Sequence, residues 1–205
     1  MNLLYRQKTA FADLPIEDVM KTALLVIDYI YGIVEGSCQD YIKAHSTIEN
    51  TNKLIDYYRA HNMPIYFVRL GFDKNYTACP NHSRAFQNIK SKGLFQLGQH
   101  DTDFVKELHY QSHDVVVNKT AASPFHCDQE FIKNLQSQNI ECLIFTGLAT
   151  DNAINLGVRE AHDMGYYTIV AEDACGGSSE DFHKWAILLL DKIANEIILV
   201  DELIK

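Results

Sequence analysis

The sequence predicts an α/β fold, a three-layer α/β/α sandwich built around a six-stranded, mainly parallel sheet. Apolar runs rich in β-branched and aromatic residues alternate with stretches of helical periodicity, as in a parallel sheet that helices cover on both faces. The chain has 205 residues, of which 47% are hydrophobic and 22% charged, enough to form one such sheet with its helices. We expect a single domain over residues 1–205, with the Rossmann-like strand order 3-2-1-4-5-6.

Six apolar runs are predicted to be strands, and the periodic stretches between them to be helices. The helix before the fifth strand is expected to stop at Gly165, because glycine readily takes the left-handed conformation that ends a helix. Two connections, 29–45 and 70–100, are longer than ordinary βα loops, and we expect them to form pocket walls. The expected strands are 23–28, 64–69, 114–119, 142–147, 166–171 and 196–200, and the expected helices are 46–61, 101–109, 128–138, 151–164 and 180–194.

Charge and composition exclude several classes of partner. The formal net charge is -9, and no window gathers lysine and arginine into a stripe, so nucleic acid is not an expected partner. No apolar run has the length of a signal peptide or a membrane span, so we expect a cytoplasmic protein with a small-molecule partner and no membrane association. Five scattered cysteines without a CxxC or Cys/His spacing predict reduced thiols and no zinc.

Three charged side chains lie at predicted strand ends, where an open parallel sheet binds its ligands: Asp28, Arg69 and Lys119. Asp28 follows the apolar run ALLVI, so its carboxylate is poorly solvated unless it meets a cation. Lys119 emerges from the buried run DVVVN and is expected to supply that cation. A structural aspartate and a lysine that extends to solvent are the alternatives.

The segment from Gly147 to Gly165 is expected to open a helix at the same edge of the sheet. Thr150 and Asp151 are good helix-capping residues, and small side chains at Ala153 and beyond let the helix approach the sheet closely. Unpaired backbone N–H groups in the first turn of such a helix can bind an oxyanion or a carboxylate. An ordinary βα turn remains the alternative.

Together these motifs resemble the isochorismatase-like hydrolase superfamily, which includes nicotinamidases and related cysteine amidohydrolases. The resemblance is carried by VID at 26–28, NK at 118–119, the run Ser123-Pro-Phe125, and TGLATDNA at 146–153 with REAHDMGY and VAEDAC after it. It runs from about residue 20 to the end and implies the same α/β fold. It also implies a non-proline cis peptide at Leu148-Ala149.

The resemblance places Ala153 where most relatives carry a nucleophilic cysteine in an Asp-Lys-Cys triad. A covalent thioester at this position is therefore impossible, and the resemblance leaves Asp28, Lys119 and the backbone amide of Ala153 as the catalytic groups. We expect substrate contacts from Ala149, Arg69, Phe125 and Tyr31.

The Asp/His metal cluster of nicotinamidases is absent from RLGFDKNY after the second predicted strand, so no metal and no other cofactor is expected. Cys38, Cys127 and Cys175 lie near the active edge, but nothing in the sequence gives any of them a lowered pKa or an acid/base partner. Cys142 opens a buried strand and is expected in the core.

Three functions follow from the resemblance. The leading one is hydrolysis of a small anionic molecule with Asp28 as acid/base, by isochorismate-type cleavage of a vinyl ether, with Lys119, Arg69 and Arg84 as the cations that hold the anion. The alternatives are a C–N hydrolase whose nucleophilic cysteine is changed to Ala153, and a non-catalytic small-molecule-binding paralogue. The resemblance also suggests a homo-oligomer.

Overall fold

The computed structural model describes residues 20–127 and 129–204, which form one six-stranded sheet with helices on both sides. All strand pairs are parallel and the order is β3-β2-β1-β4-β5-β6, so the predicted three-layer fold and strand order are confirmed. The strands are β1 Thr22–Ile27, β2 Ile65–Leu70, β3 Val115–Lys119, β4 Cys142–Leu148, β5 Tyr167–Gly176 and β6 Glu196–Ile198.

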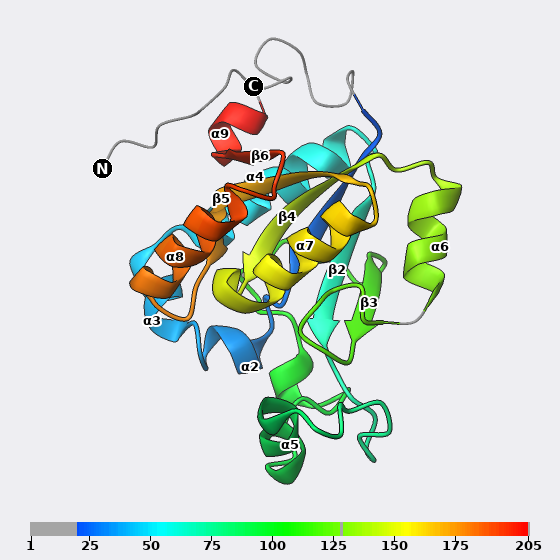
Figure 1. Cartoon of the computed structure of the whole chain (residues 1–205), viewed down its shortest axis with the longest axis vertical. Helices are drawn as coiled ribbons and strands as arrows, with labels where there is room; N and C mark the ends of the chain where they lie inside the picture. The colour runs from blue at the N-terminus through cyan, green and yellow to red at the C-terminus, as the bar shows by residue number, and fades with distance from the viewer. Residues whose placement is uncertain (1–19, 128, 205) are drawn as a thin grey trace.

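Helices cover the two faces of the sheet in separate groups. Figure 1 shows α7 and α8 in front of the sheet and α4 behind it. Each face has its own hydrophobic core, one formed with α4 and α9 and the other with α6, α7 and α8. The α-helices are α2 Tyr31–Val34, α3 Gln39–Ala44, α4 Thr47–Ala60, α5 Arg84–Ser91, α6 Gln129–Ser137, α7 Asn155–Asp163, α8 Glu180–Leu190 and α9 Val200–Leu203, with a 3-10 turn η1 at His100–Thr102 and a π turn η2 at Thr150–Ile154.

The central strands β1 and β4 are buried along their whole length, because helices cover both of their faces. Their sequences, TALLVI and CLIFTGL, are accordingly apolar without the alternation of a half-exposed strand. The register pairs Thr22 with Cys142 and Ile27 with Gly147. The ends of β1 and β4 therefore lie side by side, at the point where the strand order reverses and ligands of such sheets bind.

The prediction of a helix over 101–109 is wrong, because tertiary contacts hold residues 103–105 extended between η1 and a turn at 106–108. Only η1 is helical within it, and the Asp101 carboxylate accepts a hydrogen bond from the Phe95 N–H. Phe104 forms an antiparallel bridge with Ile30, and the Val105 N–H donates to the Tyr29 carbonyl. The extended middle of the segment thus packs beside the loop that follows β1.

Other boundaries differ by several residues. The helix expected over 180–194 ends at Leu190, and the strand expected over 166–171 extends to Gly176 because β5 pairs again with β4 after an irregularity. The expected stop at Gly165 is confirmed, since α7 ends at Asp163 and Gly165 has a φ of 87°. The long connection 29–45 contains α2 and α3, and 70–100 contains α5, which lies beyond the lower end of the sheet in Figure 1.

Candidate active site

Asp28 and Lys119 form a buried ion pair at the carboxyl ends of β1 and β3. The Lys119 Nζ atom lies 2.7 Å from Asp28 Oδ2, and the two side chains are only 1% and 5% exposed. The second oxygen, Oδ1, accepts a hydrogen bond from the Leu70 N–H at 2.8 Å. The ammonium also donates to the carbonyls of Ala121 and Ala122, at 3.3 and 2.8 Å. The predicted pairing of these two residues is therefore present.

Burial sets the electrostatics of this pair. Removal from water raises the pKa of the Asp28 carboxyl above its ordinary value, while the Lys119 charge and the hydrogen bonds from Lys119 and Leu70 oppose that rise. Asp28 is therefore easier to protonate than an exposed aspartate, although it accepts two hydrogen bonds as a carboxylate does. A group with this balance can either take up or release a proton during a reaction.

The turn after β4 approaches the Asp28 site closely at Gly147. This glycine has a φ of 126°, and a Cβ atom on it would lie 2.0 Å from the Ile27 carbonyl oxygen. Only glycine fits here, because the close contact would exclude any side chain and the backbone conformation is one that other residues rarely adopt. Asp28 itself has a φ of 56°, in the left-handed region that aspartate tolerates better than most residues.

Ala153 lies within η2, the π turn that leads from β4 into α7. The Leu148-Ala149 peptide that precedes this turn is cis, as the resemblance implied. The Ala149 carbonyl accepts hydrogen bonds from the N–H groups of Asn152 and Ile154, at 3.0 and 3.2 Å. These two donors are the residues on either side of Ala153 in the sequence. The Ala153 side chain is 2% exposed and belongs to the same apolar core as Ile27.

Two polar side chains within η2 are held by residues that follow β5. The Thr150 hydroxyl lies 2.8 Å from His183 Nδ1, and both groups are buried. The Asp151 carboxylate accepts hydrogen bonds from the N–H and the hydroxyl of Ser178, both at 2.8 Å. Nothing in the sequence points to His183 or Ser178, since only the fold brings them to η2 from about 30 residues away.

His183 is buried as a neutral imidazole. Desolvation is the main cause that lowers its pKa to about 4, and the nearby Glu180 carboxylate opposes this effect. Glu180 in turn contacts His45 at 2.9 Å and Lys184 at 3.0 Å. The imidazole thus connects the surface of α8 to the turn that carries Ala153.

The other residues expected to contact substrate have partners or positions away from the Asp28–Lys119 pair. The Arg69 guanidinium donates to Asn118 Oδ1 at 2.8 Å and to the Thr102 carbonyl at 3.0 Å. Tyr31 stacks on His100 with ring centres 4.1 Å apart. Phe125 is buried in the core that also contains Ala153, whereas Arg84 is exposed at the start of α5.

Burial raises the pKa of the thiols of Cys38, Cys142 and Cys175. Burial raises the pKa of the Cys38 thiol to about 12, and the nearby carboxylates of Asp151 and Asp28 act in the same direction. Burial likewise raises the pKa of Cys175, which donates to the Phe145 carbonyl. Cys142 is fully buried in β4, as expected. All five cysteines are thiols, and Cys127 is partly buried.

No group of three or more His, Cys, Asp or Glu side chains that could bind a metal ion occurs within residues 20–127 and 129–204. Nor does this part of the chain contain a helix of sufficient length and hydropathy to span a membrane.

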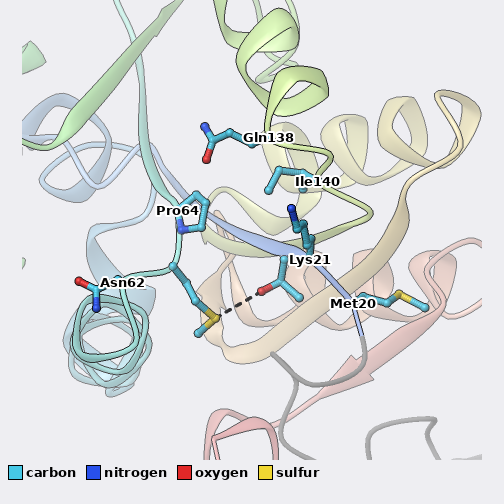
Figure 2. Close-up of a pocket in the computed structure, with 8 residues that line it drawn as sticks. Met20, Lys21, Asn62, Pro64, Gln138 and Ile140 are labelled. Carbon is cyan, nitrogen blue, oxygen red and sulfur yellow. Dashed lines mark hydrogen bonds between the residues drawn. The ribbon is translucent and has the colours of Figure 1, made fainter.

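A pocket of about 280 Å³ lies at the amino ends of β1 and β2, lined by Met20, Thr22, Met63 and Pro64 among others (Figure 2). It is therefore at the opposite end of β1 from Asp28, away from the edge where ligands of parallel sheets bind.

Residues 22–202 match the model of the isochorismatase domain. The chain belongs to the isochorismatase family. This match covers most of the sequence and includes β1 through β6, the Asp28–Lys119 pair and the η2 turn. The protein is therefore an isochorismatase-family hydrolase.

Curated relatives include amidohydrolases. Ureidoacrylate amidohydrolase RutB of Rhizobium rhizogenes is 29% identical over 184 residues, covering 81% of this chain and 74% of the relative. The isochorismatase family protein YwoC of Bacillus subtilis is 29% identical over 168 residues, covering 82% and 84%.

Solved structures share the fold. A cysteine hydrolase from Pseudomonas syringae pv. phaseolicola superposes with a TM-score of 0.77 at 19% identity, covering 90% of this chain and 91% of that one. N-carbamoylsarcosine amidase of Thermoplasma acidophilum superposes with a TM-score of 0.67 at 19% identity, covering 89% and 98%.

Proposed function

We propose that this protein hydrolyses a small anionic molecule with Asp28 as the acid/base and without a covalent cysteine intermediate. The leading reaction is cleavage of a vinyl ether of the isochorismate type. The observation that carries the proposal is the buried Asp28–Lys119 pair. The resemblance places Ala153, within η2, where most relatives carry the nucleophilic cysteine. A methyl group cannot form a thioester, so the chemistry must proceed through a proton donor and water.

In this reaction Asp28, in its acid form, donates its proton to the terminal methylene carbon of the vinyl ether. Water adds to the resulting oxocarbenium ion, and the hemiketal collapses to pyruvate and a hydroxylated product. The proton that water releases returns to the Asp28 carboxylate. Because burial raises the pKa of Asp28, more of the acid form is present than in an exposed aspartate, and Lys119 stabilises the carboxylate left after the proton is transferred.

The charges near the pair indicate how an anionic substrate would be held. Lys119 is already bonded to Asp28 and to two carbonyls, and Arg69 is bonded to Asn118 and Thr102. The backbone N–H groups of Ala149, just before η2, and of Ala153, within it, are therefore the donors that we assign to the anion, supported by the partial positive charge of the helix start.

A second candidate reaction is hydrolysis of a C–N bond by water. Two observations favour it: relatives are named ureidoacrylate amidohydrolases, and both Asp28 oxygens accept hydrogen bonds as an ionised carboxylate would. Asp28 would then take a proton from the attacking water, and the amides of Ala149 and Ala153 would stabilise the oxyanion on the carbonyl. Without a thiol at position 153, this route has no acyl-enzyme.

Product analysis separates the two reactions. The protein is incubated in D₂O with isochorismate and, separately, with ureidoacrylate, and pyruvate and ammonia are measured by NMR and by an enzymatic assay. Vinyl-ether cleavage predicts pyruvate with one deuterium in its methyl group, because the acid delivers an exchanged proton to carbon. Ammonia without pyruvate would refute the leading reaction in favour of the second, and neither product would favour the non-catalytic paralogue.

The variant Ala153→Cys tests whether the site is adapted to chemistry without a thiol. We expect at most weak amidase activity, because the surroundings of Asp28 are not shaped around an acyl-enzyme. The matched control is Ala161→Cys, which places a thiol at a second buried alanine, on α7 and outside η2. A gain of several orders of magnitude in amide hydrolysis, confined to the first variant, would contradict the proposal, since that is the scale on which a catalytic nucleophile acts.

A further inference from the structure

The outer face of α8 carries four large apolar side chains that are exposed. Phe182 is 51% exposed, Trp185 60%, Leu188 46% and Leu189 52%. We call these four residues the α8 patch. The opposite face of the same helix is buried against the sheet layer through residues that include His183, Ala186, Ile187 and Leu190. In Figure 1, α8 lies in front of the sheet, with no element drawn in front of it.

This arrangement is unusual for a surface helix, whose outward face is normally polar. The apolar residues recur at helical spacing, and the Phe182 and Trp185 rings pack edge to face with centres 5.8 Å apart. A contiguous exposed apolar stripe of this kind marks a surface that another molecule covers.

We propose that a second copy of this chain covers the α8 patch, through antiparallel packing of the two α8 helices about a two-fold axis. The two-fold arrangement makes the stripe complementary to itself, placing Trp185 against Leu188 of the other copy and Phe182 against Leu189. This inference goes beyond the proposed function and does not depend on it.

The charges around the patch favour a second copy over a strongly charged partner. The whole chain has a formal net charge of -9, which drives copies apart over most of their surface. Along α8 and its end, acidic residues are nearly balanced by Lys184 and Lys192. In the antiparallel arrangement, Asp181 at the start of one helix lies near Lys192 just beyond the end of the other, so opposite charges meet on both sides of the axis.

The size of the patch also fits a dimer. From the exposed fractions of its four side chains, the patch offers about 450 Å² of mostly apolar area per copy. A stable interface buries about 800 Å² on each partner, of which roughly 60% is apolar. The α8 patch therefore supplies most of the apolar area that such an interface needs, and the surrounding polar side chains supply the rim.

Trp185 is the only tryptophan in the chain, so its fluorescence reports on the patch directly. Sedimentation equilibrium of the full chain is expected to give twice the monomer mass of 23.4 kDa at micromolar concentration. On dilution to the monomer, the emission of Trp185 should shift to longer wavelength as the indole becomes solvated. A monomer at all concentrations, or a dimer whose Trp185 emission is that of a solvated indole, would overturn the proposal.

Two sets of variants locate the interface. Leu189→Lys should weaken self-association by at least about 30-fold, the effect of a central interface residue. The control Leu94→Lys, at a 39% exposed leucine beside α5, should leave it unchanged. Loss of the dimer in the control variant alone would place the interface elsewhere and refute the α8 patch.

A charge exchange tests the antiparallel geometry without altering the apolar residues. Asp181→Lys and Lys192→Asp should each weaken the dimer, because each brings like charges together across the axis, and the double variant should restore it. If the double variant remains as weak as the single ones, the antiparallel packing is wrong. Thermal unfolding checks that all variants are folded.

Discussion

Replacing Lys119 by methionine should destabilise the protein by an amount that depends strongly on pH. The substitution keeps the volume of the side chain but removes the ammonium 2.7 Å from Asp28 Oδ2, leaving a buried carboxyl with one remaining donor, the Leu70 N–H. Breaking one partner of a buried pair costs about 3–5 kcal/mol when the other charge stays uncompensated. The variant can avoid part of that cost only by protonating Asp28.

Protonation of Asp28 sets an upper limit on the stability that the variant loses, and this limit can be calculated. From the ordinary aspartate pKa of 3.8, holding the carboxyl neutral costs about 4 kcal/mol at pH 7 and about 1.6 kcal/mol at pH 5. Loss of the hydrogen bonds to the Ala121 and Ala122 carbonyls adds about 1 kcal/mol at either pH. We therefore expect Lys119→Met to lose about 4–5 kcal/mol at pH 7 and about 2–3 kcal/mol at pH 5.

The direction of the pH dependence follows from proton uptake by Asp28. In the variant, the pKa of folded Asp28 lies well above its unfolded value, so the folded state binds more protons and loses stability as pH rises between the two values. Urea unfolding at both pH values measures the difference from the parent protein. Lys53→Met is the control, because its ion pair with Asp201 is exposed and its removal should cost about 1 kcal/mol or less at either pH. A loss in Lys119→Met that is the same at pH 5 and pH 7 would refute this reasoning.

Three further perturbations test the surroundings of the site. Gly147→Ala should cost at least about 3 kcal/mol in urea unfolding, because its Cβ would overlap the β1 carbonyl at a φ of 126°, whereas Gly93→Ala, with a φ of 66° and open space, should cost only about 1–2 kcal/mol. Equal effects would mean that the close approach at Gly147 is not needed. As pH falls from 6.5 to 4, the parent should lose about 2 kcal/mol of stability at His183, because the unfolded state binds a proton there and the folded state, with a pKa of about 4, does not. His183→Gln should abolish this part of the pH dependence. An unchanged pH dependence in this variant would contradict a buried neutral imidazole. Hydrolysis should survive exhaustive dialysis against EDTA, and activity that is lost and then restored by zinc would show that a metal takes part.

The sheet could be predicted because its signal is local. Runs such as ALLVI and CLIFTG are too apolar for any position but the centre of a covered parallel sheet, and the strand-end positions of Asp28 and Lys119 followed from them. Their pairing needed only the strand order, which places both ends at the same edge of the sheet.

Other features depend on contacts distant in sequence. The periodicity of 101–109 suits a helix, yet bonds to Tyr29 and Phe95 hold the segment in another conformation. The sequence around His183 does not indicate its contact with Thr150, because only the packing of α8 brings the two residues together. Arg69 appeared free to bind substrate, but Asn118 on the neighbouring strand engages its guanidinium.

The most direct test of the account is kcat/KM for pyruvate release from isochorismate by the parent protein and by Asp28→Asn. Loss of a general acid predicts a decrease of at least about 100-fold in the variant. The matched control Asp114→Asn, which alters an ion pair at the opposite end of β3, should leave kcat/KM unchanged. In the parent, kcat/KM should fall as pH rises through the raised pKa of Asp28, because only its acid form donates. Equal turnover in the parent and Asp28→Asn would contradict the account, since it would remove Asp28 from the reaction.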